Sequence, residues 1–483
     1  MSLLTSQAID RLLSFLKQDS LRWRALILIF VLSLPAVTTR LYASDEIQYF
    51  AYLRSLWFDQ DLSFENEYRH FYDRGVAKTF GFQETFLEMT TSTGLRYNFG
   101  TIGSAILWAP FYAAGDSVAR IMRASGSDVA VDGYSAPYIT AVTLGSAVYG
   151  FLALVLSIVA AHRIVGSGIV PGLFVWFGTP LFFYMYIAPG MAHACSAFAV
   201  AAFVVTWLRV REKWSIRGMA LLGCFAALMA MVREQDVFFL IGPIVDFIWS
   251  SWKDVRGPNP SERSFLPRIQ VAIVGVLVTC FVYLPQVISY IVLNGHIGPP
   301  NVIQTKMDWT APYAGLVLLS SEHGLIVWTP LVLLSLCGLI LLAIRNREEG
   351  SGLSRMSHVT LGLLLMAVTQ VYVTGSLSSW ASAGAFGQRR FVGATVILVI
   401  GLAAFLKFVR SGWKRQALGC LIGLCIWWNI GLMVQFGSGM MDRQKIELQK
   451  NAYNSFVRVP QELPSLAYRY FFNRHSFYEP HNE

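Results

Sequence analysis

The sequence predicts an all-α fold, a polytopic bundle of transmembrane helices, on three observations. Of its 483 residues, 55% are hydrophobic, and the mean hydropathy is +0.50. Only 14% are charged, against about 25% in soluble domains. The apolar residues also form long uninterrupted blocks instead of the alternating patterns of half-buried helices or strands. Lipid is therefore the expected surrounding of most of the chain.

Eleven blocks are candidates for membrane-spanning helices, because a span needs about 20 mostly apolar residues. They are residues 24–43, 137–160, 168–188, 191–208, 217–232, 236–251, 269–292, 324–344, 358–377, 391–409 and 416–436. A twelfth block, 100–122, is also apolar and needs a separate argument.

Basic residues decide the topology, since Lys and Arg stay preferentially on the cytoplasmic side. The tail 1–23 carries Arg11, Lys17 and Arg22, so the N-terminus is expected inside. The other basic clusters all fall inside only if block 100–122 does not span; these are Arg163, Arg209–Arg217, Lys253–Arg268, Arg345–Arg355 and Lys407–Arg415. We therefore expect about eleven spans, an inner N-terminus and an outer C-terminus.

Three regions follow from this topology. The transmembrane domain covers residues 24–436 and includes a large first outer loop of about residues 44–136. Block 100–122 lies along the outer interface or re-enters the membrane, and its Trp108 and Tyr112 suit an interfacial segment. The tail 437–483 lies on the outer face, as a small domain or an interfacial flap.

The net charge of +9 does not indicate a nucleic-acid partner, because the cations sit in short loops between apolar blocks. The six cysteines lie in or beside apolar blocks. They form no CxxC pair and have no His at metal-ligand spacing, so we interpret them as small packing residues.

Two adjacent carboxylates, Asp45 and Glu46, follow the first span directly. Charges near lipid are costly and often functional. Acidic residues also stabilise the first turn of a helix. The residues alone leave catalysis and helix capping at about even odds.

A second polar group lies in the outer loop before block 391–409, and it contains Trp380, Gly384, Gly387, Arg389 and Arg390. Glycines let backbone come close to a ligand, and arginines offer planar donors to phosphate. Two arginines on the outer side run against the positive-inside tendency. A specific phosphate is favoured over pairing with lipid headgroups.

Weaker candidates lie in the other outer loops: Arg96, His193, Arg233, Lys306, Glu322 and His323. Each has a structural alternative, such as snorkelling for Arg96 or a self-neutralising turn for Arg233. Their expected convergence on one side of the membrane is the stronger signal. Asp246 is the main ionisable residue inside a span, whereas ion-coupled transporters place such groups at mid-membrane.

These motifs resemble the GT-C superfamily of membrane glycosyltransferases that use polyprenyl-phosphate carriers. The nearest resemblance is to the bacterial branch related to protein O-mannosyltransferases and lipid A aminoarabinose transferases. Four segments carry it: Asp45-Glu46, Tyr97–Tyr112, Ser321–Pro330 and Trp380–Arg390. The chain lacks an obvious large soluble C-terminal domain, so the acceptor class stays open among glycan, lipid and protein.

The resemblance implies an inverting transfer of sugar from a polyprenyl-phosphate donor at the outer face of a bacterial inner membrane, which is the periplasmic face. It implies Asp45 as general base, with Glu46 as helper or as a metal or sugar contact. Arg389 and Arg390 would bind the donor phosphate, with Arg96, Lys306 and His323 as weaker phosphate contacts. Further substrate contacts would come from Trp380, Gly384, Gly387, Glu322, His193 and Arg233.

No metal or other cofactor is expected to be required, although some relatives of this kind use a divalent metal. Three other function classes remain open. A lipid-linked glycan polymerase or ligase also needs outer arginines but no early Asp-Glu pair. A lipid flippase or transporter needs a central polar cavity, which the apolar spans disfavour. A non-catalytic scaffold would leave the outer arginines unexplained.

Overall fold

The structure is a computed structural model that describes residues 20–76, 81–255, 266–348, 355–382, 384–409 and 412–477. Within these ranges the chain is helical and has no strand, apart from two isolated β-bridges, Thr90 with Arg96 and Met307 with Leu377. The predicted all-α class is confirmed. The predicted tail 1–23 lies mostly outside the described residues.

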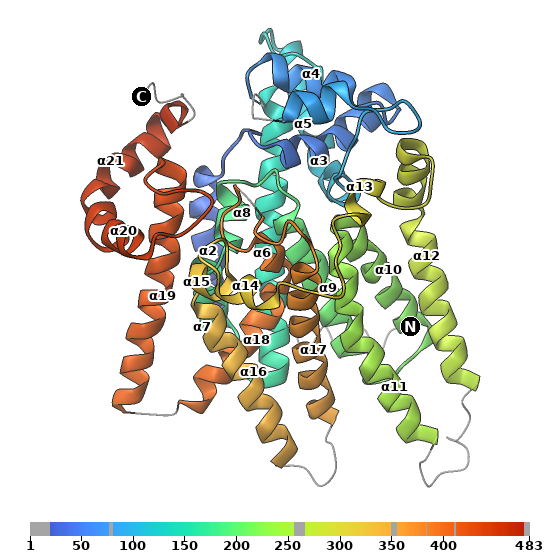
Figure 1. Cartoon of the computed structure of the whole chain (residues 1–483), viewed down its shortest axis with the longest axis vertical. Helices are drawn as coiled ribbons and strands as arrows, with labels where there is room; N and C mark the ends of the chain where they lie inside the picture. The colour runs from blue at the N-terminus through green and yellow to red at the C-terminus, as the bar shows by residue number, and fades with distance from the viewer. Residues whose placement is uncertain are drawn as a thin grey trace.

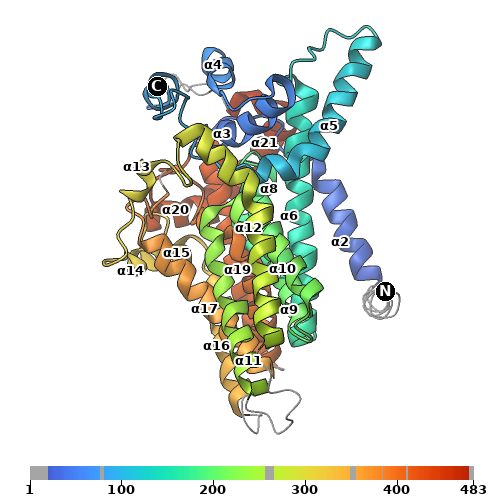
Figure 2. The ribbon, with the colours of Figure 1, turned by 90° about the vertical axis from the view of Figure 1, so that its right-hand side faces the viewer.

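The lower part of the molecule is a bundle of steep helices (Figures 1 and 2). Six stretches are long and apolar enough to cross a membrane, so the chain is an integral membrane protein. They lie in α6 (Ala136–Val165), α9 (His193–Val210), α12 (Leu266–Asn294), α17 (Arg355–Gly375), α18 (Thr395–Phe408, preceded by η6, Arg389–Ala394) and α19 (Trp413–Ser438). The other bundle helices are α2 (Ser20–Ser33), α7 (Ile169–Gly178), α10 (Ile216–Val232), α11 (Ile241–Val255) and α16 (Leu331–Glu348).

All eleven predicted blocks contain helix, but five are not continuous α-helices; one of them, block 391–409, begins in η6 before α18. Helix α2 and the short η1 (Leu34–Ala36) end before residues 38–42, which have no regular structure. Block 168–188 splits at Pro180 into α7 and α8 (Leu181–Tyr186), and block 324–344 splits at Pro330 into α15 (Leu325–Trp328) and α16. Proline lacks an N–H and disfavours helix in the residue before it. Block 236–251 begins in the 3₁₀ turn η4 (Glu234–Leu240) before α11.

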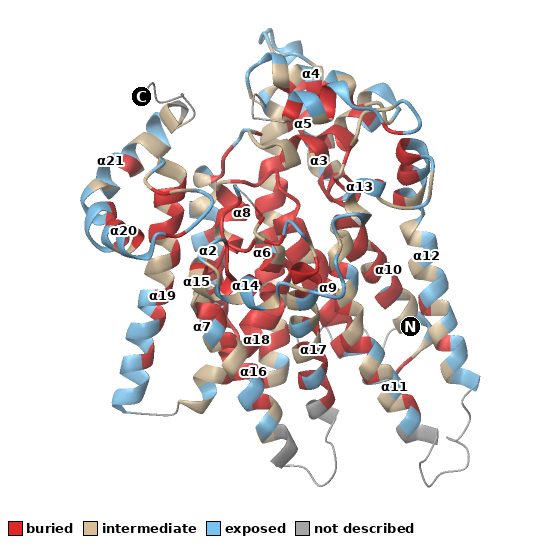
Figure 3. Ribbon diagram, in the orientation of Figure 1, coloured by how far each residue is buried: buried red, intermediate tan, exposed pale blue. Residues whose placement is uncertain are grey.

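The bundle has a buried centre and a lipid-facing edge (Figure 3). In the apolar stretch of α9, 89% of the residues are buried inside the protein, against 17% for α12. Small residues let the inner helices approach closely: a Cβ on Gly338 of α16 would lie 1.9 Å from the carbonyl oxygen of Gly401 in α18. Such contacts are how helices pack tightly without a hydrophobic driving force.

The predicted first outer loop folds into a helical cap on one end of the bundle (Figure 1). It contains α3 (Ser44–Arg54), η2 (Ser55–Asp59), α4 (Glu65–Asp73), η3 (Gln83–Glu88) and α5 (Gly103–Ala124). Block 100–122 corresponds to α5, which is not among the candidate spans and projects beyond the end of the bundle (Figure 2). This position agrees with the interfacial placement that the charges predicted.

The tail after α19 folds back on that helix. Its elements are α20 (Leu448–Tyr453), η7 (Asn454–Arg458), α21 (Val459–Phe472) and η8 (Arg474–Phe477). The Gln435 amide of α19 donates to Ser455 Oγ at 2.8 Å, and Tyr470 donates to the Ala36 carbonyl at 2.7 Å. The tail therefore joins the last span to the end of the first helix.

Candidate functional site

An ion pair between distant parts of the chain joins the two principal predicted motifs. Arg389 Nη1, at the start of η6, donates to Asp45 Oδ2, in the first turn of α3, at 2.7 Å. The two residues are 344 positions apart. The Asp45 side chain is 37% exposed, so the carboxylate is ion-paired and still open to a substrate.

The neighbouring carboxylate, Glu46, has a different position. It is fully buried, and its Oε2 accepts hydrogen bonds from the backbone N–H groups of Tyr42 at 2.8 Å and Ala43 at 3.1 Å. Burial raises the pKa of Glu46 to about 7, although N–H groups of Tyr42, Ala43 and Gly190 oppose this. The capping interpretation thus describes Glu46, and the predicted role as a helper or sugar contact has no support in its position. The Glu46 carboxylate caps the N-terminus of α3. Asp45 does not take part in this capping, and its side chain faces Arg389.

Two more arginines converge beside this pair. Arg390 donates to the oxygen of Gln235 at 3.3 Å and to Ser382 Oγ at 3.2 Å. Arg233, at the end of α10, donates to the same Gln235 oxygen at 3.1 Å, and its buried Nη1 has no hydrogen-bond partner among the described residues. Both arginines therefore bind neutral groups, which do not compensate their charge.

At the predicted turn, Arg233 donates a hydrogen bond to Gln235 and also interacts electrostatically with the Asp236 carboxylate. Asp236 is buried and accepts a hydrogen bond from Ser196 at 2.6 Å. His193 lies in the same region, buried and edge-on to Tyr184, with a ring-centroid distance of 4.4 Å. Arg233, Arg389 and Arg390 all act electrostatically on the His193 ring. An anion is the natural complement of such a site.

The loop that carries the arginines is held in shape by Gln388. This buried side chain donates to the carbonyl oxygens of Trp380 at 3.0 Å and His323 at 3.2 Å. Gly387 has φ +60°, and a Cβ there would lie 2.9 Å from Pro180 Cγ. Glycine is thus required at this turn by conformation and by the proline at the start of α8.

His323 lies beneath this loop and does not act as a cation. It is fully buried with φ +60°, and its ring stacks on Trp328 at 4.8 Å. Burial, and next the positive charge of Arg389, lower the pKa of His323 to about 4. A neutral ring cannot give the phosphate a positive charge, so its predicted role as a phosphate contact gains no support.

Four other predicted residues lie away from the Asp45–Arg389 pair or face solvent. Arg96 pairs with Glu65 at 3.1 Å within the cap, and Gly384 donates its N–H to Gln444 of the tail at 3.0 Å. Lys306 and Glu322 are exposed. The backbone of Lys306 accepts from Ser378 N at 2.8 Å, so it helps to fix the arginine loop.

The structure adds Gln235, Gln388 and Tyr49 to the site. Tyr49 lies one turn after Asp45 on α3, and burial is the main cause that raises its pKa to about 12. Its hydroxyl therefore stays protonated and can donate a hydrogen bond. The spacing from Asp45 could have suggested Tyr49, and adjacency to Arg233 and Arg389 could have suggested the two glutamines.

Among the described residues, no group of three or more His, Cys, Asp or Glu side chains could hold a metal ion. The expectation that no metal is required stays a prediction.

Comparison with solved structures identifies the architecture. The chain is similar to an archaeal oligosaccharyltransferase, AglB from Archaeoglobus fulgidus, solved with an inhibitory peptide and a dolichol-phosphate, with a TM-score of 0.51 and 12% sequence identity. The fold is of the GT-C type. The similarity covers 91% of this chain but only 56% of that structure. No protein-family model matches the sequence, and no curated protein matches it.

Proposed function

We propose that this protein is an inverting glycosyltransferase that moves a sugar from a polyprenyl-phosphate donor to an acceptor at the outer face of a bacterial inner membrane. The observation that carries the proposal is the ion pair of Asp45 with Arg389. It places a carboxylate able to act as a base directly beside a guanidinium able to bind phosphate. In one sugar transfer, the carboxylate can therefore contact the acceptor hydroxyl while the guanidinium contacts the donor phosphate.

The transfer proceeds in one displacement. The acceptor hydroxyl oxygen attacks the anomeric carbon of the sugar as its proton passes to the Asp45 carboxylate. The bond between the anomeric carbon and the phosphate oxygen breaks, and the lipid phosphate leaves with the electron pair. Arg389 and Arg390 stabilise that negative charge. Arg233 and the Tyr49 hydroxyl supply further donors at the same place.

The ion pair also suggests an order of events. Without substrate, Arg389 compensates the charge of Asp45. A donor phosphate competes for the same guanidinium, which weakens the hold on Asp45. The carboxylate is then released to act as a base only when the donor is bound.

The test is transfer from a panel of radiolabelled polyprenyl-phosphate sugars by purified protein in lipid vesicles. We expect the Asp45→Asn protein to fold normally and to lose at least about a hundredfold in turnover, as removal of a general base does. Asp73→Asn, which changes an exposed carboxylate on α4, is the matched control and should keep full activity. Normal turnover by a folded Asp45→Asn protein would refute Asp45 as the base.

A second candidate is the transfer of a preassembled glycan, as by a ligase or an oligosaccharyltransferase. The GT-C fold, shared with an oligosaccharyltransferase, favours this alternative over a flippase. It uses the same phosphate contacts but does not need the early Asp-Glu pair. Activity with a lipid-linked oligosaccharide, and none with any single-sugar donor, would select it.

A further inference from the structure

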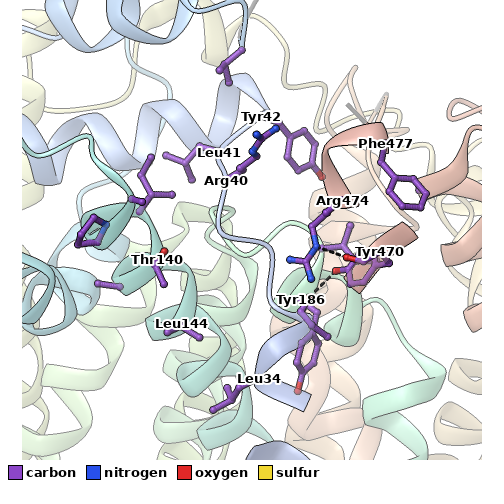
Figure 4. Close-up of a pocket in the computed structure, with 18 of the residues that line it drawn as sticks. Leu34, Arg40, Leu41, Tyr42, Thr140, Leu144, Tyr186, Tyr470, Arg474 and Phe477 are labelled. Atoms are coloured by element: carbon purple, nitrogen blue, oxygen red, sulfur yellow. Dashed lines mark hydrogen bonds between the residues drawn. The ribbon is translucent and has the colours of Figure 1, made fainter. Parts of the chain in front are cut away.

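A groove of about 1930 Å³ lies outside the site described above. Its walls are α6 and α8 on one side and α19 and α21 on the other, and α5 and the segment 40–42 close its outer end (Figure 4). Leu34, Leu144 and Phe182 are among the side chains that line it. The lining is mostly apolar and is formed in part by two membrane spans, which suits a lipid chain.

Basic residues outnumber acidic ones in the lining. The groove is lined by four arginines, Arg40, Arg74, Arg443 and Arg474, and by two carboxylates, Asp128 and Asp132. Asp132 already accepts hydrogen bonds from the N–H groups of Tyr134 and Ser135. Figure 4 shows Arg40 and Tyr42 on the side of the groove that faces Arg474 and Tyr470. The charges therefore complement an anionic headgroup above an apolar tail.

The groove lies next to the Asp45–Arg389 pair, and two residues that line it are bonded to or packed against neighbours of that pair. Tyr42 lines the groove, and its N–H is held by Glu46, the neighbour of Asp45. Phe183 also lines the groove and stacks on Phe386, three residues before Arg389, at 4.6 Å. Neither Asp45 nor the arginines Arg389 and Arg390 line it. The described residues thus form two separate groups of arginines. One group lines the groove, and the other, Arg389 and Arg390, lies beside Asp45.

We infer that the groove binds the acceptor of the transfer, and that this acceptor is a membrane lipid with an anionic headgroup and a free hydroxyl. The inference rests on the proposed function, because the donor phosphate takes Arg389 and Arg390 and leaves the arginines of the groove for the other substrate. The lipid tail lies between α6 and α19, and its headgroup meets Arg40 and Arg474. The headgroup hydroxyl then reaches Asp45 past Tyr42, where it loses its proton as the sugar bond forms.

The test measures binding without any donor, so its outcome is independent of catalysis. Phosphatidylglycerol with a photoactivatable acyl chain carries both a phosphate and free hydroxyls. After irradiation in vesicles, mass spectrometry should map its label to α6, α8, α19 and α21. Phosphatidylcholine with the same chain should label these helices about tenfold less, which corresponds to about 1.4 kcal/mol. A matching polyprenyl-phosphate probe reports whether the groove holds the donor instead.

Two variants with matched controls test the location. Gly437 lines the groove, and a Cβ there meets no atom within 4 Å, so Gly437→Leu places a side chain in the groove. Gly423 lies in the same helix, has the same open space and does not line the groove. We expect Gly437→Leu to reduce phosphatidylglycerol labelling about tenfold and Gly423→Leu to leave it unchanged. Arg40→Gln should abolish the preference for the anionic probe, while Arg69→Gln, on an exposed arginine of α4, should not.

Several results would overturn the inference. Equal labelling by the two phospholipids would show no headgroup recognition. Preferential labelling of the groove by the polyprenyl probe would assign it to the donor tail. Labelling that Gly437→Leu does not change would place the lipid elsewhere. Loss of transfer in Asp45→Asn with intact groove labelling supports both proposals, whereas intact labelling with no transfer from any donor would remove the proposed function and keep only a lipid site.

Discussion

Asp45 and Glu46 are adjacent in sequence, yet their environments give them different chemistry. The Glu46 carboxylate is buried and binds backbone N–H groups, whereas the Asp45 carboxylate is partly exposed and pairs with Arg389. In the first turn of a helix, consecutive side chains point about 100° apart. One of the two can therefore close the helix end while the other faces the outer loops.

The buried Glu46 predicts a pH-dependent stability. Its pKa is about 7 in the folded protein against an ordinary value near 4.3. The protonated form is favoured by folding, so this contribution is complete below about pH 4 and is lost as the pH rises through about 7. As the pH rises from 5 to 8, the free energy of unfolding of Glu46→Gln should increase relative to that of the wild type by up to about 3 kcal/mol, measured by thermal unfolding. Glu322→Gln, on an exposed carboxylate, should track the wild type, and a pH-independent difference for Glu46→Gln would contradict the assignment.

We predict that the planar geometry of the Arg389 guanidinium, and not only its positive charge, contributes to transfer. Arg389→Gln should lower transfer at least about a hundredfold, as the loss of a transition-state donor does. Arg389→Lys should recover only part, since an ammonium cannot bind phosphate and Asp45 through a planar fork. Arg69→Gln serves as the control for a lost surface arginine. Full activity of Arg389→Lys would show that a point charge suffices.

At the scale of elements, the arginine loop owes its shape to neighbours that are remote in sequence. Gln388 ties it to the His323 carbonyl, and Ser378 pairs with the Lys306 backbone. Pro180, at the break between α7 and α8, packs against Gly387. Breaks in the helices thus create the surface on which the loop rests, and the loop in turn orients Arg389.

Two glycines of this loop provide a matched pair of variants. Gly387 and Gly384 both have positive φ, but only at Gly387 would a Cβ meet a neighbour, Pro180 Cγ, closer than 3 Å. Gly384→Ala should cost about 1 kcal/mol of stability for the left-handed conformation. Gly387→Ala should cost more and should also lower kcat/KM, because it displaces Arg389. Unfolding and transfer assays on both proteins test this; equal effects of the two substitutions would argue against a specific role for the Pro180 contact.

At the scale of the whole molecule, polarity separates the two ends of the bundle. The C-terminal turns of α9 and α18, which carry the basic residues Arg209 and Lys407, lie at the end opposite the cap that carries Asp45 (Figure 1). Inside the bundle, both oxygens of Asp246 accept hydrogen bonds from Arg211 at 2.8 and 2.9 Å. The distribution of charged residues therefore indicates how the helix bundle is oriented and anchored in the membrane.

This orientation predicts labelling by a membrane-impermeant thiol reagent in intact bacterial cells. In a background without the six native cysteines, Glu322→Cys should react from outside. Lys213→Cys should react only after the cells are opened. Both positions are exposed in the structure, so accessibility depends on the side of the membrane. The reverse pattern would place the site in the cytoplasm and contradict the proposed acceptor compartment.

The sequence by itself determined the fold class, most spans and the two principal motifs. Blocks of apolar residues and loop charges report directly on the bilayer, which acts on each segment separately. The loop charges predicted that block 100–122 does not span, and α5 is not among the helices long and apolar enough to cross a membrane. The breaks at Pro180 and Pro330 were also visible in the sequence, but a count of apolar residues passes over them.

Only the tertiary structure decided which outer residues meet. The pairing of Asp45 with Arg389, the capping by Glu46 and the withdrawal of Arg96 to Glu65 all depend on how loops fold over the bundle. Neutral partners such as Gln235 and Gln388 carry no charge signal in a sequence. The groove likewise exists only because the tail returns to the first helix. Long-range contacts of this kind depend on packing geometry, which local composition does not encode.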